Sequence, residues 1–478
     1  MALLPTSAVL FMLMICQQGS TNLVIYPHAN GPPASNHFTI FLSQGGNKHK
    51  SFTYISTSDH RTHDASSVKP HRSVSWTSFA FTGSPVTVEV HTQSDFHNCL
   101  VRPMSYGFHC RRTGPKVAQF TVQHNTRMMS VEFDNDQTNN HKDITNKLVV
   151  FADPPETNIP SKHDASVLFY DVGLHNLNGQ KLLDSHIKEV YLAPGAFVQG
   201  GFRTSGGSVK IRGRGIMSGT IYKFHDKRFL WGMINLDKGS HHVVEGITLV
   251  DSPQFFYRGL SDNNVVRNLK TLAPWTYNSD GVGIGHDGLV EDSFFMANDD
   301  SIKVYTDNMV VRRCVVWQAQ NGAVFQTGWW TGRDMQKVRI SDIDVIHTDW
   351  CTFKGDNCHI SDNDAVLDQA GDTKHFKTTD ISFENIRIEG SCPRIINFKM
   401  HPGATGTVSN VRFTNWDVES QPTHDSLHNE IAGSSSGGQV TNWHFTNFKI
   451  GGHCVHNPTS EDFKIDPHTT SDIHFTCH

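Results

Sequence analysis

The chain has 478 residues, more than a usual single domain, so we expect two domains or one domain joined to a long solenoid. It is rich in Gly, Asn, Asp, Ser, Thr, Val, Ile and Phe, and few stretches repeat apolar residues with the period of a helix, which favours an all-β protein. The formal net charge of −5 at pH 7, with histidine counted as neutral, argues against a nucleic-acid partner.

Residues 1–20 have the composition of a secretion signal. A short apolar run from Ala8 to Cys16 is followed by a small, polar segment at positions 17–20. The run is too short to span a bilayer, and no later segment approaches the roughly 18 apolar residues of a membrane-spanning helix. We therefore expect a secreted, extracellular protein without a membrane segment.

Removal of this signal leaves eight cysteines in the chain. An even number of cysteines in an exported protein is compatible with disulfides. We expect the pairs Cys99–Cys110 and Cys351–Cys358, because each pair brackets a short, turn-rich loop. The cysteines are scattered and none has the CxxC spacing typical of zinc ligands, so we expect no metal site.

Positions 21–160 predict a β-sandwich domain. Short strands with alternating apolar residues are separated by turn clusters, a pattern typical of two packed antiparallel sheets. We find no paired carboxylates in this region that would demand chemistry, so we interpret it as a support or carbohydrate-binding module. A polar stretch with prolines at 153–162 is the expected linker. The clearest predicted strands are 37–42, 51–55, 86–92, 118–123 and 147–151.

Positions 161–478 predict a right-handed parallel β-helix. Pairs of short apolar segments recur around a polar or small corner, and Val244, Val266, Val290 and Val311 follow one another by 22, 24 and 21 residues. Such a period without helical segments is typical of a solenoid. Leucine-rich repeats would show an LxxLxL frame and propeller blades need roughly 40 residues, so neither fits. Longer steps, above all 348–378, are expected to be loops inserted at corners.

The stretch 275–305 contains the candidate catalytic residues. Asp280 precedes the pair Asp299 and Asp300 by 19 residues, close to one coil of the predicted stack. Coils of a parallel stack lie about 4.8 Å apart, so the three carboxylates should converge. Like charges this close resist joint ionisation, so at least one carboxyl should keep its proton well above its ordinary pKa. A protonated acid beside an ionised base is what glycosidic cleavage requires.

Several neighbours could complete a sugar-binding site. Asn278 and Asn298 could donate hydrogen bonds, and Lys303 supplies a positive charge that keeps a carboxylate ionised. His286 is more simply a loop histidine, and each aspartate alone could be a turn residue; the cluster as a whole favours the catalytic interpretation. Aromatic faces are the usual apolar part of a carbohydrate groove. The candidates are Trp275, Tyr277, Tyr305, Trp329 and Trp330.

The motifs NSDG at 278–281, ANDDSIKVY at 297–305 and QNGAVFQTGW at 320–329 closely resemble glycoside hydrolase family 49, the dextranases and isopullulanases. So do VYLAPGAFVQGGF at 190–202 and NWHFTNFKIGG at 442–452. The resemblance implies a β-sandwich joined to a right-handed β-helix, endo-hydrolysis of α-glucans and inversion. It implies Asp299 as the general acid, Asp280 and Asp300 as the residues that activate water, and Gln326 as a substrate contact. The polygalacturonases of family 28 share the fold and a similar trio, but their Gly-His-Gly and Arg-Ile-Lys elements downstream of the aspartate pair are missing here, so they are the more distant match.

We therefore predict a secreted polysaccharide hydrolase, dextranase-like, that acts as a monomer without a metal or organic cofactor. In an inverting single displacement the acid and base carboxyls stand roughly 6.5 to 9.5 Å apart to admit a water, and we expect that separation here. Three alternatives stay open: a polygalacturonase-like pectin hydrolase, a polysaccharide lyase and a non-catalytic carbohydrate-binding β-helix. A lyase would need a uronic acid substrate, and a binding protein would release no reducing ends.

Overall fold

The computed structural model describes residues 22–60, 71–134, 144–328, 333–350, 352–354, 357–369, 375–422 and 427–478. The predicted secretion signal, Trp329, Trp330 and the predicted Cys351–Cys358 disulfide lie outside this description.

The N-terminal residues form the predicted β-sandwich. Alternate residues of β2 and β6 are buried, as a strand with one covered face requires. Ile40 and Val88 from one sheet meet Phe79 and Val150 from the other in a shared apolar core. One sheet has the order β1-β5-β11-β10-β7, with β4 on β5, and the other β3-β2-β6-β9-β8. The strands are β1 (Asn22–Ile25), β2 (Phe38–Gln44), β3 (Asn47–Ser51), β4 (Tyr54–Thr57), β5 (Ser73–Thr82), β6 (Val86–Thr92), β7 (Cys99–Arg102), β8 (Arg111–Gly114), β9 (Val117–Val122), β10 (Arg127–Phe133) and β11 (Lys147–Asp153).

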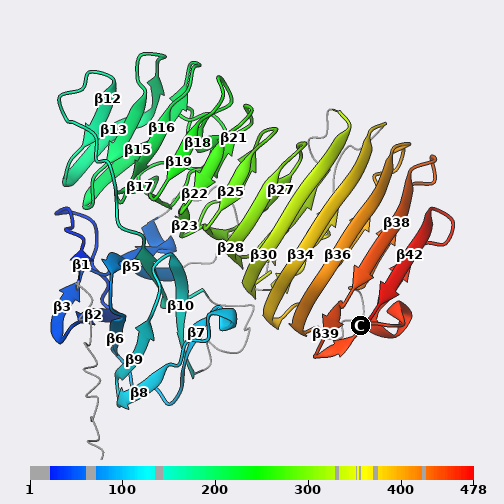
Figure 1. The fold of residues 1–478 in the computed structure, drawn as a ribbon, viewed down its shortest axis with the longest axis horizontal. Helices are drawn as coiled ribbons and strands as arrows, with labels where there is room; N and C mark the ends of the chain where they lie inside the picture. The colour runs from blue at the N-terminus through cyan, green and yellow to red at the C-terminus, as the bar shows by residue number, and fades with distance from the viewer. Residues whose placement is uncertain are drawn as a thin grey trace, which may run out of the picture.

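The rest of the chain is a right-handed parallel β-helix, which confirms the predicted fold. Its strands belong to one 29-stranded sheet in which each strand pairs with the equivalent strand of the next coil. Figure 1 shows the coils stacked side by side, with the sandwich beneath the first of them. One ladder runs through β16 (Lys210–Gly213), β19 (Val243–Glu245), β22 (Val265–Arg267), β25 (Leu289–Glu291), β28 (Val310–Gln318), β30 (Met335–Thr348), β34 (Lys377–Ser391), β36 (Thr407–Ser420), β38 (Gln439–Thr446) and β42 (Thr470–Thr476).

The predicted repeat matches the pairing of this ladder. Val244, Val266, Val290 and Val311 are partners on successive strands, and all four are buried in the core of the coils. Side chains of one kind therefore stack at one position of every coil, which buries a continuous apolar column. The predicted 348–378 insertion includes a separate hairpin of β31 (Thr352–Lys354) and β32 (Asn357–His359) outside the main sheet.

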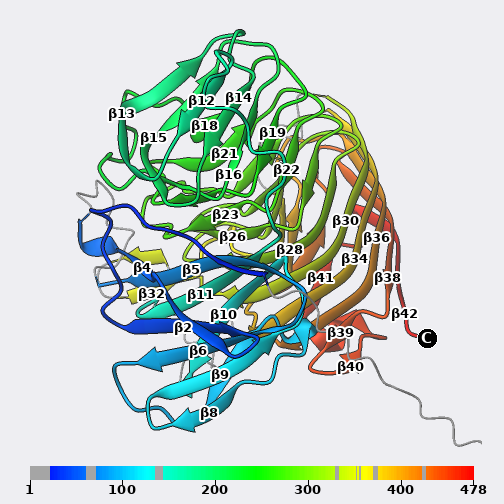
Figure 2. The same ribbon diagram turned by 60° about the vertical axis from the view of Figure 1, so that its left-hand side comes forward.

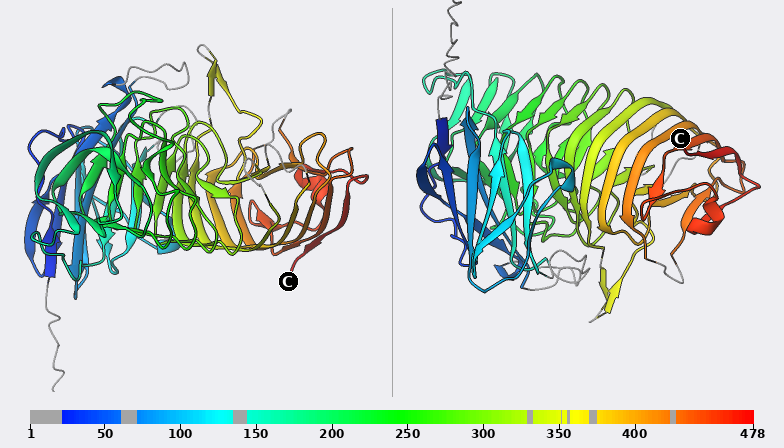
Figure 3. Two further views of the ribbon diagram at one scale, coloured as in Figure 1. Left: turned by 90° about the horizontal axis from the view of Figure 1, so that it is seen from above. Right: turned by 60° about the horizontal axis from the view of Figure 1, so that its bottom comes forward.

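A second ladder carries the groove described below. It contains β18 (Gly232–Asn235), β21 (Phe255–Gly259), β24 (Val282–Ile284), β27 (Ile302–Val304), β29 (Phe325–Thr327), β33 (Leu367–Gln369), β35 (Ile396–Lys399) and β37 (Asn429–Ala432). Figure 3 shows that the coils keep a common orientation along the length of the helix.

Left-handed residues turn the chain at one corner of successive coils. Asn385, Asn415 and Asn447 have φ values of 55°, 53° and 53°, a conformation that asparagine tolerates better than most residues. The side-chain amide of Asn415 donates to Asn385 at 3.1 Å, and that of Asn447 donates to Asn415 at 3.2 Å. The corners that the sequence predicted as polar therefore also bond to one another along the stack.

The sandwich packs against the side of the helix through a buried interface, and Figure 2 shows the two parts from a second side. Trp76 and Phe151 of the sandwich share an apolar cluster with Phe294 of the coils. Asp153, predicted as the start of a linker, instead ends β11 and forms a buried ion pair with Lys270 at 2.8 Å. The stretch after it, up to β12 (Val167–Tyr170), crosses to the helix.

Among the described residues, two disulfides hold loops outside the coils. Cys99–Cys110 was predicted and is confirmed, whereas Cys454–Cys477 was not predicted. Two described cysteines, Cys314 and Cys392, are free and buried. No helix among the described residues has the length and apolarity that a membrane crossing requires.

Candidate active site

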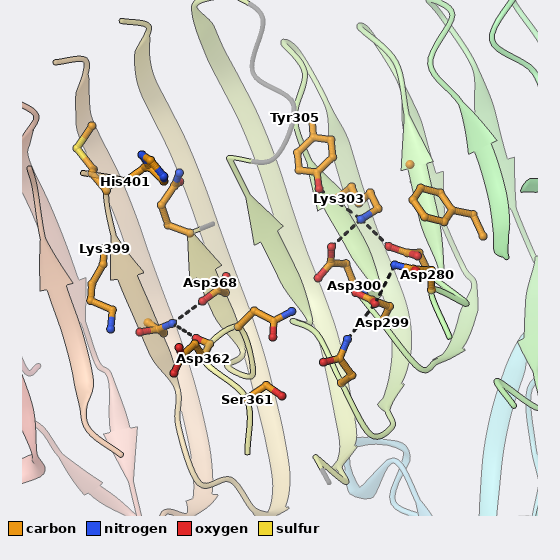
Figure 4. A pocket seen from close by; sticks show the side chains of 18 of the residues that line it. Asp280, Asp299, Asp300, Lys303, Tyr305, Ser361, Asp362, Asp368, Lys399 and His401 are labelled. Atoms are coloured by element: carbon orange, nitrogen blue, oxygen red, sulfur yellow. Dashed lines mark hydrogen bonds and ion pairs between the residues drawn. The ribbon is translucent and has the colours of Figure 1, made fainter. Parts of the chain in front are cut away.

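A groove of about 1420 Å³ crosses the strands of the second ladder. Figure 4 shows its side chains spread over several neighbouring coils, with the three aspartates and Lys303 on one side and Lys399 and His401 on the other. The residues that line it include Trp231, Phe255, Arg258, Tyr277, Asn278, Asp280, Asp299, Asp300, Lys303, Tyr305, Asn321, Asp362, Asp368, Asn397, Lys399 and His401.

Stacking of two adjacent coils brings the aspartates together. Gly283 of β24 pairs with Lys303 of β27, and the amide of Gly281 donates to the carbonyl of Asp300 at 3.0 Å. One carboxylate oxygen from each of Asp280, Asp299 and Asp300 lies within 4.8 Å of the others. These nearest oxygens are closer than the 6.5 to 9.5 Å expected between the carboxyl groups, because Asp280 lies one coil, about 4.8 Å, from the other two aspartates.

Lys303 lies between two of the three carboxylates. Its ammonium is 2.6 Å from an oxygen of Asp280 and 2.6 Å from an oxygen of Asp300. It also donates to the hydroxyl of Tyr305 at 3.3 Å and lies over the ring of Phe255, 4.8 Å from the centroid. The oxygens are spaced closely enough to hold a metal ion, but this ammonium already supplies a positive charge between two of them.

Asp299 is held by neutral donors instead. The side-chain amides of Asn321 and Asn278 donate to its Oδ2 at 2.9 and 3.3 Å, and the backbone amide of Asp300 donates to its Oδ1 at 2.9 Å. No ion pair of Asp299 is found among the described residues. The three carboxylates are therefore not equivalent, since only two of them contact the ammonium.

Burial sets the acidity of the cluster. Burial, and next the charge of Asp300, raises the pKa of Asp299 to about 7. Burial also raises the pKa of Asp280 well above its ordinary value, against the opposing charge of Lys303. Three buried carboxylates facing one ammonium titrate as a unit, and such a unit retains a proton near neutral pH. The charge of Lys303 opposes the rise in the pKa of Asp280, whereas Asp299 has no contact with the ammonium, so we assign that proton to Asp299.

A loop aspartate supports the backbone beneath Asp299. Asp364 accepts the amide of Gly322 at 2.8 Å and the amide of Ser361 at 2.7 Å. Gly322 has a φ of 81°, and a Cβ there would lie 2.6 Å from the backbone of Asp299, so no larger residue fits without a shift. The adjacent Asn321 is thereby placed to donate to Asp299. Asp364 thus positions the groove without lining it.

Three residues predicted to contact sugar are not in the groove. Trp275 is 0% exposed, and its indole donates to Ser56 of the sandwich at 2.9 Å, so its prediction as a sugar platform is wrong. Asn298 is buried and donates to the carbonyl of Thr276 at 3.4 Å. Gln326 is buried and does not line the groove, and its amide donates to Asp368 at 2.9 Å. The loop histidine His286 accepts a backbone amide from Asp307 at 3.1 Å and does not line the groove.

Tyr277, Tyr305 and Asn278 line the groove as the sequence suggested. Tyr277 is 41% exposed and presents its ring beside Phe224, with 5.8 Å between the two centroids. Trp329 and Trp330, the remaining aromatic candidates, lie outside the described residues.

The sequence did not indicate the other half of the groove. Asp368 is buried, and its two oxygens accept amides from Gln326 at 2.9 Å and Asn397 at 2.6 Å. Burial raises the pKa of Asp368 to about 7. Lys399 forms an ion pair with Glu430 at 3.0 Å. These polar residues form one column across the coils because of the strand register. The successive partners on neighbouring strands are Lys303, Gln326, Asp368, Asn397 and Glu430.

At the opposite end of the groove, Trp231 is 55% exposed and has the guanidinium of Arg258 over its ring, 5.6 Å from the centroid. An exposed indole beside a groove offers the flat apolar surface that a pyranose ring covers. The sequence signal for Trp231 is its position at the end of the short turn-rich segment 219–231, before the coils that carry the aspartates.

The chain is similar over most of its length to known enzymes. No protein-family model matches it. It is 24% identical to a dextranase of Arthrobacter sp. (strain CB-8), over 82% of this chain and 76% of that one. It is 25% identical to an isopullulanase of Aspergillus niger, over 80% and 78% of the two chains. The solved structure of Dex49A from Penicillium minioluteum has the same fold, with a TM-score of 0.75, 20% identity and 96% of each chain covered.

Proposed function

We propose that this chain, a glycoside hydrolase related to the dextranases and isopullulanase of family 49, cleaves α-glucans at internal bonds with inversion at the anomeric carbon. The observation that carries the proposal is the cluster of Asp280, Asp299 and Asp300 around Lys303 on the wall of a long groove. The relatives support an α-glucan as substrate, and they do not favour a pectin hydrolase or a non-catalytic protein.

Asp299 acts as the general acid in this proposal. It gives its proton to the glycosidic oxygen as the bond to the anomeric carbon breaks, and the amides of Asn321, Asn278 and Asp300 then stabilise the carboxylate that remains. A pKa of about 7 keeps the proton on Asp299 below neutral pH, where a free carboxylic acid would have lost it.

Asp280 and Asp300 act together as the base. Lys303 holds one oxygen of each, and the Oδ1 of Asp280 is buried without a hydrogen-bond partner among the described residues, which leaves a free lone pair for a water molecule. That water attacks the anomeric carbon and transfers its proton to this carboxylate pair. Lys303 holds both carboxyl groups in place and is a positioning residue rather than a proton donor.

The separation of the two carboxyl groups bears on the stereochemistry of the reaction. Inverting enzymes usually separate their two carboxyls by roughly 6.5 to 9.5 Å, and retaining enzymes by about 5 to 5.5 Å. The nearest oxygens here lie within 4.8 Å. We nevertheless favour inversion, because two carboxylates fixed by one ammonium suit a base that holds water better than a single nucleophile, and because the family resemblance implies it.

The shape of the groove supports cleavage within a chain. It extends across the coils on both sides of the aspartates, from Trp231 to Gly433, so a polymer has contacts available in both directions. Trp231, Phe255 and Tyr277 supply apolar faces on the one side, and Asp368, Asn397 and Lys399 supply polar contacts on the other.

Incubation with dextran, pullulan and polygalacturonate, followed by NMR of the first product anomers, tests the proposal. We expect new reducing ends from at least one α-glucan, none from polygalacturonate, and the β-anomer first. The α-anomer appearing first would contradict inversion while leaving hydrolysis intact. Release of unsaturated products from polygalacturonate would replace the hydrolase by a lyase.

We also propose that the chain is exported and acts as a monomer. The disulfides Cys99–Cys110 and Cys454–Cys477 support an oxidising compartment. Expression of the full sequence in a secreting host, with mass spectrometry of the medium, should give a chain that starts near residue 21 and elutes at the size of one copy. A product retained in the cell would contradict export.

A further inference from the structure

A second concave site, of about 700 Å³, lies in the sandwich rather than in the β-helix. We infer that it binds the acidic groups, carboxylate or sulfate, of a charged polysaccharide. One wall is the loop that follows β7, with Tyr106, Phe108 and His109, and the other is formed by β8, β9 and the start of β10. The site is therefore built from different elements than the catalytic groove.

The lining is basic and contains no carboxylate. Arg111, Arg127, His109 and His124 line it, and the lining residues include neither aspartate nor glutamate. The nearby Glu89 on β6 is already in an ion pair with Lys48 at 2.6 Å. A concave surface lined by one sign of charge concentrates ligands of the opposite sign.

The two arginines of this site differ from most arginines of the protein. Neither Arg111 nor Arg127 has an ion pair among the described residues. The contrast is with exposed or half-buried arginines that each contact a carboxylate: Arg228, Arg258, Arg313, Arg339 and Arg387. Arg127 donates to the carbonyl of Thr126 at 3.4 Å, and without an acidic partner both guanidinium groups keep further N–H donors available for a carboxylate or sulfate.

The site is also held in shape before any ligand arrives. The guanidinium of Arg127 lies over the ring of Tyr106, 4.6 Å from its centroid, and Tyr106 meets Phe108 edge to face at 5.7 Å. The Cys99–Cys110 disulfide ties the loop that carries these rings to β7. Rings and arginines that are already ordered lose little conformational entropy on binding.

Aromatic rings beside arginines favour a sugar over other anions. A pyranose can cover the ring of Phe108 while its acidic group reaches Arg111 or Arg127, and Thr121 and Gln123 offer hydroxyl and amide groups to its hydroxyls. A nucleic acid would require a longer basic stripe, and the net charge of −5 opposes it. The consequence is a protein anchored to a charged glycan matrix while its groove acts on a neutral chain.

Geometry separates the two sites. Figures 1 and 2 both show β8 and β9 on the side of the sandwich away from the parallel coils. The strands β8 and β9 pair only within the five-stranded sheet. Tyr106 also packs against the apolar cluster between sandwich and coils, but no residue that lines this site lines the groove, so binding here should be independent of the catalytic residues.

Isothermal titration of the full chain carrying Asp299→Asn, which prevents hydrolysis of the probe, tests the inference with dextran sulfate, polygalacturonate and uncharged dextran. We expect Arg111→Glu to weaken binding of at least one acidic probe by about tenfold or more, the value of a charge-assisted contact. Binding of uncharged dextran, which uses the groove, should not change. Loss with only the sulfate or only the carboxylate probe identifies which acidic group the site takes.

Arg112→Glu is the matched control. Arg112 is the next residue on β8 and is also exposed, but it lies over Phe96 at 5.8 Å and does not line the site. Its substitution should leave all three affinities within about twofold of the parent, below the effect of one such contact. Unchanged binding in Arg111→Glu, an equal loss in Arg112→Glu, or equally sensitive binding of duplex DNA would overturn the inference. Arg111 is exposed, so equal thermal midpoints should show that the variant folds.

Discussion

Two buried clusters of charge in this protein have opposite compositions. At the interface between sandwich and β-helix, Arg102 contacts Glu132 at 3.1 Å and Glu389 at 2.8 Å, and His347 contacts Glu132 at 2.6 Å. Burial lowers the pKa of His347, but the charge of Glu132 outweighs burial and raises that pKa overall. Two acidic groups, Glu132 and Glu389, therefore face two basic groups, Arg102 and His347. In the groove, by contrast, three carboxylates face the single ammonium of Lys303.

This difference separates a structural cluster from a reactive one. Balanced charges with satisfied hydrogen bonds hold their protons in fixed places, and removing one partner leaves a buried charge without compensation. An excess of carboxylates forces one of them to keep a proton that it can give away. The interface cluster should therefore govern stability and the groove cluster the rate, and the following substitutions test that division.

The largest expected effect is on the rate. Asp299→Asn removes the proton donor, and the initial rate on dextran should fall by about 10²–10⁴-fold, the range of general acid catalysis. The thermal midpoint at pH 6 should not decrease, because the amide keeps the shape of the side chain. Reducing-end release measures the first and calorimetry the second. Undiminished activity of the Asp299→Asn variant would remove Asp299 from the mechanism.

The next effect is on stability. Arg102→Met leaves Glu389 buried without its cation and Glu132 with His347 alone, which should lower the free energy of unfolding by about 3–5 kcal/mol. Activity per folded molecule should stay near that of the parent. Arg228→Met, which breaks the exposed pair with Asp226, is the control and should cost about 1 kcal/mol or less. Equal losses in the two variants would show that the interface cluster is not special.

The pH dependence should come from the groove. Because Asp299 must be protonated and its pKa is raised to about 7, the rate at saturating substrate should fall about tenfold per pH unit once the pH exceeds 7. The folded protein binds this proton more tightly than the unfolded chain does. Its stabilising contribution is therefore complete at pH below about 4 and is lost as the pH rises through 7. Asp299→Asn should remove that loss, so the variant should be the more stable protein at pH 8 but not at pH 4.

The smallest expected effect concerns the amides that hold Asp299. Asn321→Ala removes the 2.9 Å hydrogen bond to its Oδ2, and kcat should fall by about tenfold, the value of one charge-assisted hydrogen bond. Asn278→Ala removes the longer 3.3 Å contact and should have the lesser effect. The alkaline limb of the pH profile should also move to higher pH in Asn321→Ala, since the carboxylate loses a stabilising donor. A lower kcat with an unmoved limb would indicate a general structural defect.

The sequence was sufficient to predict the stack and the acidic trio, because both depend on local repetition. Val244, Val266, Val290 and Val311 mark equal positions of four coils, and the same period places Asp280 one coil from Asp299. No comparable signal marks Asp368 or Lys399. They follow insertions of irregular length, so their coil position cannot be counted forward from Lys303.

Contacts between distant segments account for the other errors. Trp275 stands five residues before Asp280 and has the flat aromatic ring expected of a sugar platform. Its indole nevertheless donates to Ser56, a residue more than 200 positions earlier in the chain. Likewise Cys454 and Cys477 meet only because β40 (His453–Cys454) lies beside the end of the last coil. Periodicity reports which residues share a face of one coil, but it carries no information on what covers that face.

The distance between the proton donor, Asp299, and Asp280 is set by the spacing of adjacent coils, which the backbone fixes. The donor and Asp280 belong to neighbouring rungs, and main-chain bonds such as Gly281 to Asp300 at 3.0 Å fix how far apart those rungs stand. Neither side-chain repacking nor mild warming should increase the spacing between these two coils while the backbone hydrogen bonds persist. Turnover should consequently persist undiminished until these rungs separate, and then vanish together with the ordered state.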